Sequence, residues 1–135
     1  MDIYQEKVRQ ANQLLDEFGL DMWMVLVRET AEHTDPALKL LGRLNAVWTA
    51  AFIFTRTGER IAITGQGDDE AVRIQGLFDE VIPYTQSIQT VLLEVLDRFK
   101  PNKIGVNFSK SDVSADGLTY GLWLSLQDYL AGTPY

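Results

Sequence analysis

The sequence predicts a three-layer α/β domain: a mixed, mostly parallel sheet of about five strands, with helices on both faces. Apolar runs of strand length alternate with segments of helical periodicity, in the order α-β-α-β-β-α-β-α-β-α. Two adjacent β-type runs joined by a tight turn make the sheet mixed rather than purely parallel. The length of 135 residues fits one domain with one core, spanning residues 1–135.

The chain opens with a predicted amphipathic helix and an interior strand. Residues 2–18 place four apolar side chains on one helical face, and Gly19 follows as a stop. These side chains are Val8, Ala11, Leu15 and Phe18. Residues 22–27 form a continuous apolar run, which is typical of a strand covered on both faces.

The next stretch, residues 28–45, begins with polar side chains and has the least regular pattern in the chain. Asp35 and Pro36 predict the start of a short helix that runs through Leu41 and stops at Gly42. This stretch therefore forms a long connection before the next strand.

A hairpin follows this connection. Residues 47–55 and 60–64 are rich in Ala, Phe, Ile and Thr, and a turn at Thr57 and Gly58 joins them. A short link with glycine between two β-type runs predicts two antiparallel strands.

The segment GQGDDEAVRIQGLF, residues 65–78, predicts a helix with three carboxylates in its first turn, where they complement the helix dipole. These are Asp68, Asp69 and Glu70. Its opening Gly65 and Gly67 do not make a dinucleotide fingerprint, because Glu70 occupies the position of the third glycine. We therefore expect an ordinary turn and helix start.

The last third of the chain predicts a strand at residues 80–84 and a regular helix capped by Ser87. That helix has an unbroken apolar period, formed by Ile88, Val91, Leu92, Val95, Leu96 and Phe99. Residues 103–108 predict another interior strand, and residues 116–131 a final helix with Ser114 or Asp116 as its cap. Its buried face is expected to hold Leu118, Leu122, Leu126, Tyr129 and Leu130.

The composition excludes several classes of function. A net charge of -7 would repel a phosphate backbone, so we expect no nucleic-acid partner. No apolar run approaches the roughly 20 residues that span a bilayer, and the first residues lack a signal-peptide pattern. With no cysteine there is no disulfide framework. We expect a cytoplasmic protein without a membrane partner.

Catalytic side chains are scarce in this sequence. It contains one histidine, His33, and nothing that resembles a metal-ligand set or an activated nucleophile. We therefore predict no catalytic residues, no metal ligands and no cofactor in this chain. A chain that can fold but lacks these groups is expected to be part of an enzyme.

The irregular stretch, residues 28–45, carries candidate functional side chains. His33 lies in the irregular stretch, and its default interpretation is an exposed loop histidine. The alternative is that Arg28, Glu29, His33 and Asp35 contribute to a site completed by another domain or subunit, since loops on a rigid scaffold often do so. Among the tryptophans, Trp48 and Trp123 are the candidates for facing a partner.

Five blocks of the sequence, taken in order, resemble the N-terminal domain of the creatinase, prolidase and aminopeptidase P superfamily, whose catalytic half has the pita-bread fold. The blocks are VRQANQLLDEFGLDMWMVL, AFIFTRTGERIAIT, GQGDDEAVRIQGLF, VLLEVLDRFKPNKIGVNFS and LTYGLWLSLQDYLAG. One departure is the segment RETAEHTDPALKLLGRLNAVW, which is longer than and different from the family's Tyr-x-x-Gly-Phe type segment.

The resemblance implies a ribonuclease H-like domain at the N-terminus of a longer Xaa-Pro peptidase. In that family two divalent metal ions (Mn, Co or Zn) lie in the C-terminal catalytic domain, held by two Asp, one His and two Glu, and activate a water. The implied partners are that catalytic domain, a second copy in a homodimer, and a proline-containing peptide substrate. In relatives this domain assists dimerisation and shapes the substrate entrance.

Three alternatives remain open from the sequence, and one of them is a small stand-alone enzyme. The chain could be a stand-alone α/β binding or dimerisation module that has no catalytic half. It could also be the corresponding domain of a creatinase-type amidinohydrolase.

Overall fold

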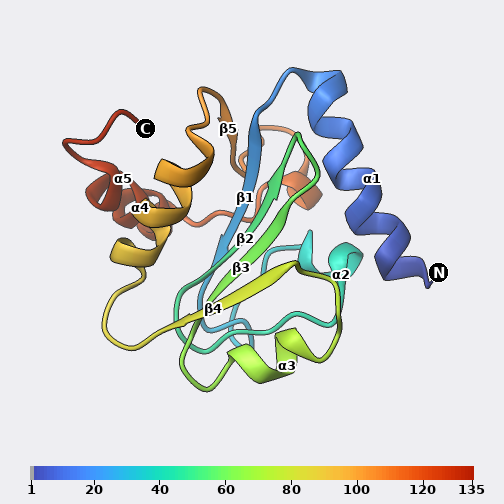
Figure 1. Cartoon of the computed structure of the whole chain (residues 1–135), viewed down its shortest axis with the longest axis horizontal. Coiled ribbons are helices and arrows are strands. Elements are labelled where there is room, and N and C mark those ends of the chain that lie inside the picture. Colours follow the sequence, from blue (N-terminus) through green and yellow to red (C-terminus); the bar gives the residue numbers. More distant parts are fainter. Residues whose placement is uncertain (1) are drawn as a thin grey trace.

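The computed structural model describes residues 2–135 and has the predicted three-layer architecture (Figure 1). The five strands form one sheet in the order β4-β3-β2-β1-β5. Only β2 runs against the other four, which confirms a mixed, mostly parallel sheet. The elements are α1 (Ile3–Phe18), β1 (Met22–Val27), α2 (Leu38–Leu41), β2 (Ala50–Thr55), β3 (Arg60–Gly65), α3 (Asp69–Arg73), β4 (Glu80–Tyr84), α4 (Ile88–Phe99), β5 (Ile104–Gly105), the 3-10 helix η1 (Val113–Ala115) and α5 (Tyr120–Leu130).

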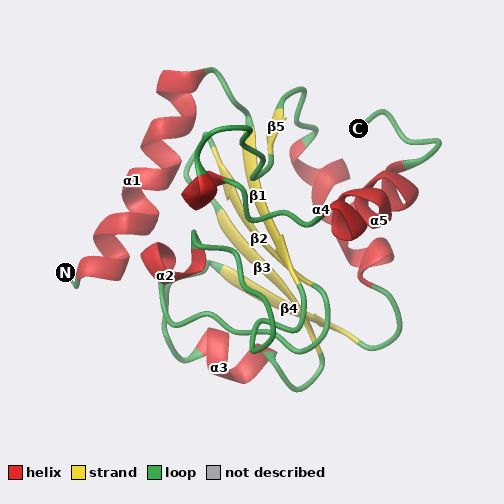
Figure 2. Ribbon diagram, turned by 180° about the vertical axis from the view of Figure 1, so that it is seen from behind, coloured by secondary structure: helices red, strands yellow, loops and turns green. Residues whose placement is uncertain are grey.

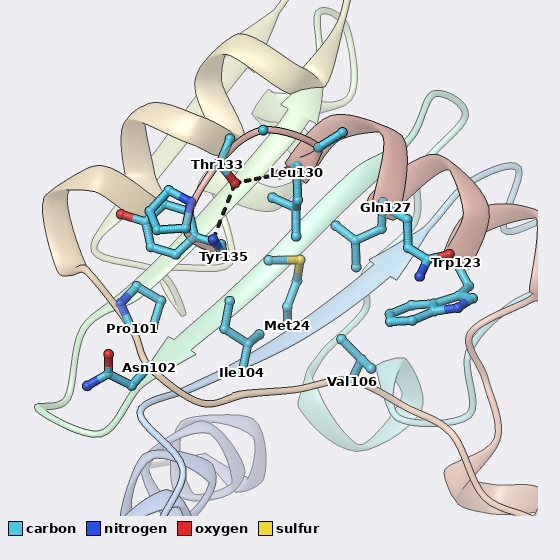
Figure 3. A pocket seen from close by; sticks show the side chains of 14 residues that line it. Met24, Pro101, Asn102, Ile104, Val106, Trp123, Gln127, Leu130, Thr133 and Tyr135 are labelled. Atoms are coloured by element: carbon cyan, nitrogen blue, oxygen red, sulfur yellow. Dashed lines mark hydrogen bonds between the residues drawn. The ribbon is translucent and has the colours of Figure 1, made fainter.

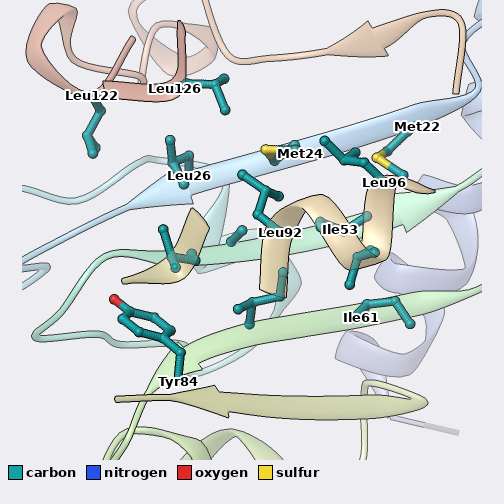
Figure 4. Close-up of a cluster of buried hydrophobic side chains, with 14 of the residues drawn as sticks. Met22, Met24, Leu26, Ile53, Ile61, Tyr84, Leu92, Leu96, Leu122 and Leu126 are labelled. Atoms are coloured by element: carbon teal, nitrogen blue, oxygen red, sulfur yellow. The ribbon is translucent and has the colours of Figure 1, made fainter. Parts of the chain in front are cut away.

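The helices divide between the two faces of the sheet (Figures 1 and 2). α1, α2 and α3 cover one face through an apolar cluster that includes Val8, Leu41 and Val72. α4 and α5 cover the other face, and Figure 4 shows that cluster, with Leu92 and Leu96 of α4 packed against the sheet. No helix within residues 2–135 is long and apolar enough to cross a membrane.

The central strand explains why the sheet is stable. All six residues of β2 are buried, and Phe52 and Phe54 have no exposed surface. Burying one such side chain contributes roughly 1.5–3 kcal/mol. Because β2 pairs with β1 on one side and β3 on the other, its main-chain hydrogen bonds are also satisfied within the sheet.

Several predicted boundaries are confirmed. β1, β4 and α4 have the bounds that the sequence indicates, and Ser87 accepts a hydrogen bond from the Gln89 amide as the cap of α4. Asp2 caps α1 by accepting from the Gln5 amide at 2.9 Å, and Gly19 ends this helix in the left-handed conformation with φ 68.

The hairpin starts later than predicted. The expected strand at residues 47–55 begins only at Ala50. The amide groups of Val47 and Trp48 donate to Oδ2 of Asp68, at 3.0 and 3.4 Å, so they are held by the loop before α3 instead of joining the ladder.

The strand predicted at residues 103–108 is short and lies at the edge of the sheet rather than in its interior. Only Ile104 and Gly105 pair, in parallel with β1. Beyond them the Asn107 carbonyl accepts from the Leu118 amide at 3.0 Å, and the Phe108 amide donates to the Val106 carbonyl. These local bonds replace the ladder after β5.

The final helix also differs from the prediction of residues 116–131. It begins at Tyr120, and the hydroxyl of Thr119 accepts from the Leu122 amide at 3.2 Å as its cap. Asp116 instead accepts from the Ser109 amide at 3.1 Å and closes a loop, so neither Asp116 nor Ser114 caps α5. Leu118 is buried as expected, but it lies before the helix.

The helix predicted within residues 65–78 covers only Asp69–Arg73. Arg73 pairs with Asp69 at 3.0 Å and with Glu70 at 2.8 Å, which joins the two ends of this short helix. The left-handed Gly76, with φ 67, follows soon after and leads the chain toward β4.

Candidate functional site

The sheet brings four strand ends to one edge. β1, β3, β4 and β5 run in the same direction, so their carboxyl ends lie together. In open α/β sheets ligands bind outside the carboxyl ends of the strands. Two adjoining hollows, of about 270 and 400 Å³, occupy this edge and share Arg28 and Glu29 in their walls.

The first hollow contains all four candidates of the irregular loop. Arg28, Glu29, His33 and Asp35 line it, with Leu26 of β1 and Leu122 of α5 among the apolar side chains. The structure thus brings the four side chains to one hollow, and their role at a substrate entrance stays a prediction. Glu32, Gly117, Thr119 and Gly121 also line the hollow, and sequence reasoning did not single them out for this site.

Asp35 is the buried anchor of this loop, with 1% of its surface exposed. Its carboxylate accepts from the Ala37 amide at 2.9 Å and from Nδ2 of Asn107 at 2.7 Å. Asn107 in turn accepts at Oδ1 from Nε1 of Trp23 at 2.7 Å. Asp35 is thus a structural acceptor that ties the loop to the segment after β5, and it is not free to contact a ligand in solution.

Gly117 explains how the chain passes this carboxylate. A Cβ at Gly117 would lie 2.1 Å from Cγ of Asp35, which no side chain could tolerate. The chain there runs directly over the Asp35 carboxylate, and the Leu118 amide bonds to the Asn107 carbonyl. The loop and the segment before α5 are therefore fixed against each other.

Arg28, Glu29 and His33 are exposed around the mouth of the same hollow. The backbone under them is ordered, because the amides of Glu29 and Thr30 donate to the carbonyls of Val47 and Ala46. Glu29 has a positive φ of 45, which is uncommon for a residue with a side chain. A hydrogen-bonded backbone thus presents these three polar side chains to solvent.

Arg28 is the available cation of the site. Nη2 of Arg28 lies 3.1 Å from the position that a Cβ on Gly121 would occupy, so its guanidinium rests beside the start of α5. It takes part in none of the ion pairs found within residues 2–135. With Glu29 and Glu32 nearby, the hollow offers groups of both charges to a polar ligand.

The second hollow is built around two aromatic side chains. The Trp48 side chain lies against Gly65, where a Cβ would be 2.7 Å from it. Its ring is 5.9 Å from that of Tyr84, whose hydroxyl donates to the Thr49 carbonyl at 2.5 Å. Burial, with smaller contributions from Tyr129 and Asp68, raises the pKa of Tyr84 to about 12, so this hydroxyl remains a donor at neutral pH.

Trp123 lies elsewhere, in a third hollow of about 570 Å³ beside the edge strand β5 (Figure 3). Met24 and Ile104 from the strands, and Leu130 from α5, line the same hollow. Phe108 packs edge-on against Trp123 at 5.0 Å. The two tryptophans proposed as interface residues thus belong to different surfaces.

The groups at these sites can bind and orient a polar ligand. Within residues 2–135 no group of three or more His, Cys, Asp or Glu side chains is arranged to hold a metal ion. None of the carboxyl-edge residues pairs a nucleophile with a base. The carboxyl edge of the sheet presents charged, amide and aromatic side chains to solvent.

The fold of this chain is similar to solved structures of known proteins. The N-terminal domain of Xaa-Pro dipeptidase from Lactobacillus brevis superposes with a TM-score of 0.66 at 13% identity, covering 94% of this chain and 90% of that one. The chain has the fold of an Xaa-Pro dipeptidase N-terminal domain. The Creatinase/Prolidase N-terminal domain of an X-Pro dipeptidase from Streptococcus pyogenes matches with a TM-score of 0.60 at 14% identity, covering 96% and 91%.

A longer protein with this creatinase/prolidase-type fold is also similar. Xaa-Pro dipeptidase from Bacillus anthracis matches with a TM-score of 0.62 at 15% identity, covering 96% of this chain but 31% of that one. The chain therefore spans about a third of that enzyme. No family model matches the sequence, and no curated protein matches it. At these identities the similarity establishes the fold.

Proposed function

We propose that this chain is the non-catalytic N-terminal domain of an Xaa-Pro dipeptidase- or aminopeptidase-type metallopeptidase. The observation that carries the proposal is the superposition on an isolated N-terminal domain of Xaa-Pro dipeptidase across 94% of this chain. The scarcity of catalytic side chains in the sequence agrees with this role, because hydrolysis of an amide needs an activated water or nucleophile.

The parent enzyme hydrolyses the peptide bond that precedes proline, in the cytoplasm. Its catalytic domain would follow this one and hold two divalent metal ions (Mn, Co or Zn). Those ions would activate the attacking water. This domain's own residues take no part in that chemistry.

This domain shapes the substrate entrance through its carboxyl edge. Arg28, Glu29 and His33 are exposed there. The buried Asp35 carboxylate holds the loop by accepting from the Ala37 amide and the Asn107 side chain. A peptide approaching this edge meets the guanidinium of Arg28 and the carboxylates of Glu29 and Glu32, which suits the charged termini of a short peptide. Trp48, on the adjoining hollow, and Trp123, beside β5, are the proposed contacts with the catalytic domain or with the second copy of a homodimer.

The reading frame beyond Tyr135 in the source gene tests the proposal. We expect it to continue into a segment with two Asp, one His and two Glu at the spacing of a two-metal site. A stop codon directly after Tyr135 would instead favour a stand-alone binding or dimerisation module. A creatinase-type amidinohydrolase would be recognised by turnover of creatine rather than of Xaa-Pro dipeptides.

The entrance role has its own test in the parent enzyme. Arg28→Ala and Glu29→Ala should raise KM for Xaa-Pro dipeptides while leaving the bound metal content unchanged, because neither residue is among the proposed ligands of the metal ions. Ile74→Ser is the matched control, since Ile74 is 74% exposed and lines neither hollow at the carboxyl edge. An unchanged KM in both variants would remove these residues from the entrance.

A further inference from the structure

The hollow of about 570 Å³ beside β5 is separate from the carboxyl edge of the sheet (Figure 3). It shares no lining residue with either of the two hollows at that edge. Its volume lies within the roughly 300–1,000 Å³ of pockets that hold small molecules. It is therefore a candidate binding site that the proposed substrate entrance does not use.

The floor of this hollow is apolar. Met24 of β1 and Leu126 of α5 are 1% and 3% exposed, and both belong to the cluster that α4 and α5 form with the sheet. Ile104 of β5 and Val106, two positions later, add apolar side chains to the lining. Water over such a floor is readily replaced by the apolar part of a ligand, which favours binding.

Residues 131–135, which follow α5, form one wall, and hydrogen bonds hold this wall in place. The Thr133 hydroxyl donates to the Leu130 carbonyl at 2.6 Å, and the Tyr135 amide donates to the Thr133 hydroxyl at 3.3 Å (Figure 3). The Tyr135 hydroxyl donates to Oδ1 of Asp97 at 3.0 Å. The wall thus exists before a ligand arrives, which lowers the entropy cost of binding.

The lining of the hollow selects against charge. Among residues 2–135, no Asp, Glu, Lys, Arg or His lines it, whereas Arg28 and Glu29 line both hollows at the carboxyl edge. An ionised ligand would lose part of its hydration here without gaining a counter-charge, which costs free energy. The hollow therefore suits an uncharged ligand.

One end of the hollow presents a ring and an amide. Trp123 and Gln127 lie four positions apart on α5, so they are neighbours on one side of this helix (Figure 3). Phe108 packs edge-on against the Trp123 ring at 5.0 Å and holds its orientation. The side-chain hydrogen bonds within residues 2–135 involve the indole of Trp23 but not that of Trp123, and they leave the Gln127 amide without a partner.

We propose that this hollow binds an uncharged aromatic carboxamide, with its ring against Trp123 and its amide paired with Gln127. The ring buries apolar area over Met24 and Leu126 and gains from contact with the indole. The two amides can each donate and accept one hydrogen bond. The inference goes beyond the proposed function and does not depend on a peptidase parent. Because Trp123 is also a proposed partner contact, the purified chain is the form to test.

NMR spectroscopy of the isotope-labelled chain with indole-3-acetamide as the probe tests the site. The indole N–H signal that disappears in Trp123→Phe should shift with a Kd on the order of 0.1–1 mM, as expected for a molecule of this size. The indole signal of Trp48, at the carboxyl edge, should stay in place. Indole-3-acetate, which is ionised at neutral pH, should bind at least about 10-fold more weakly. Removal of the amide, in 3-methylindole, should weaken binding about 5-fold.

Two neighbouring variants on α5 test the role of the amide. Gln127→Ala should raise the Kd of indole-3-acetamide about 5-fold, because the ligand amide loses its partner. Asp128→Asn is the matched control, since Asp128 is exposed on the same helix but does not line the hollow, and it should leave the Kd unchanged. Gln127 is also exposed, so circular dichroism should show both variants folded.

A Trp123 signal that does not shift at about 5 mM indole-3-acetamide would overturn the proposal, because a site of the expected Kd would be largely filled. So would equal affinity for indole-3-acetate. A Kd that responds to Asn102→Ala rather than to Gln127→Ala would also contradict it, since Asn102 lies at the other end of the hollow (Figure 3). None of these outcomes bears on whether a catalytic domain follows Tyr135.

Discussion

Nδ2 of Asn107 donates a 2.7 Å hydrogen bond to the carboxylate of Asp35, which lies 72 positions earlier in the chain. The same amide accepts at Oδ1 from the indole of Trp23. One side chain after the edge strand therefore fixes the polar loop after β1, the loop that carries the candidate entrance residues. The position of this loop at the carboxyl edge of the sheet therefore depends on the hydrogen bonds of Asn107.

Asn107→Ala should destabilise the chain by about 1–3 kcal/mol, because it leaves a buried carboxylate and an indole N–H without their partner. Urea unfolding monitored by circular dichroism measures the change. The matched control is Asn102→Ala, whose side chain forms no hydrogen bond within residues 2–135 and which should cost less than about 0.5 kcal/mol. Equal losses for both variants would argue against the anchoring role.

Two glycines near the same loop should respond in opposite ways to alanine. Gly117→Ala should destabilise by about 1–3 kcal/mol, because the new methyl would overlap the Asp35 carboxylate. Gly121→Ala would meet only the flexible end of Arg28, 3.1 Å away, and should stabilise α5 by up to about 1 kcal/mol. Thermal unfolding of the two variants in parallel checks this, and a tolerated Gly117→Ala would contradict the close approach.

The position of the α5 cap gives a third prediction. Thr119→Ala should cost about 0.5–2 kcal/mol, because the Leu122 amide loses its acceptor. Ser114→Ala, at the residue that the sequence suggested as a cap, should have little effect on α5. If chemical denaturation ranked the two variants the other way, the helix start at Tyr120 would be wrong.

Tyr84 makes the stability depend on alkaline pH. Its pKa of about 12 in the folded chain exceeds the usual value near 10, so its contribution is complete below pH 10 and is lost as the pH rises through 12. Tyr84→Phe removes the hydrogen bond to Thr49 and should lower stability near pH 7 by about 1 kcal/mol. The gap between the two proteins should then narrow between pH 10 and 12. Unfolding curves with the same gap across that window would show an ordinary pKa.

Much of the fold could be predicted from the sequence because its signals are local. β1 is one apolar run, and α4 combines an unbroken helical period with the Ser87 cap. The errors occur where distant contacts decide. β5 ends at Gly105 because Asn107 bonds to Leu118 and Asp35, and α5 begins late because Gly117 must pass over Asp35. No local pattern indicates either constraint.

The proximity of the candidate residues could be predicted from the sequence, while their role at a substrate entrance stays a prediction. Arg28, Glu29, His33 and Asp35 are close in sequence, so one loop brings them together. The sequence does not indicate that Asp35 is buried while the other three side chains are exposed. Thr119 and Gly121 come from the start of α5, and only the tertiary packing of α5 places them in the same hollow.

We propose that this chain folds by itself and depends on another domain for chemistry. The direct measurement is to incubate the purified chain with Xaa-Pro dipeptides and Mn²⁺ or Co²⁺ and to follow the release of proline. The account predicts that the dipeptides remain intact, since no described residues form a two-metal site. Metal-dependent release of proline by the chain alone would contradict it.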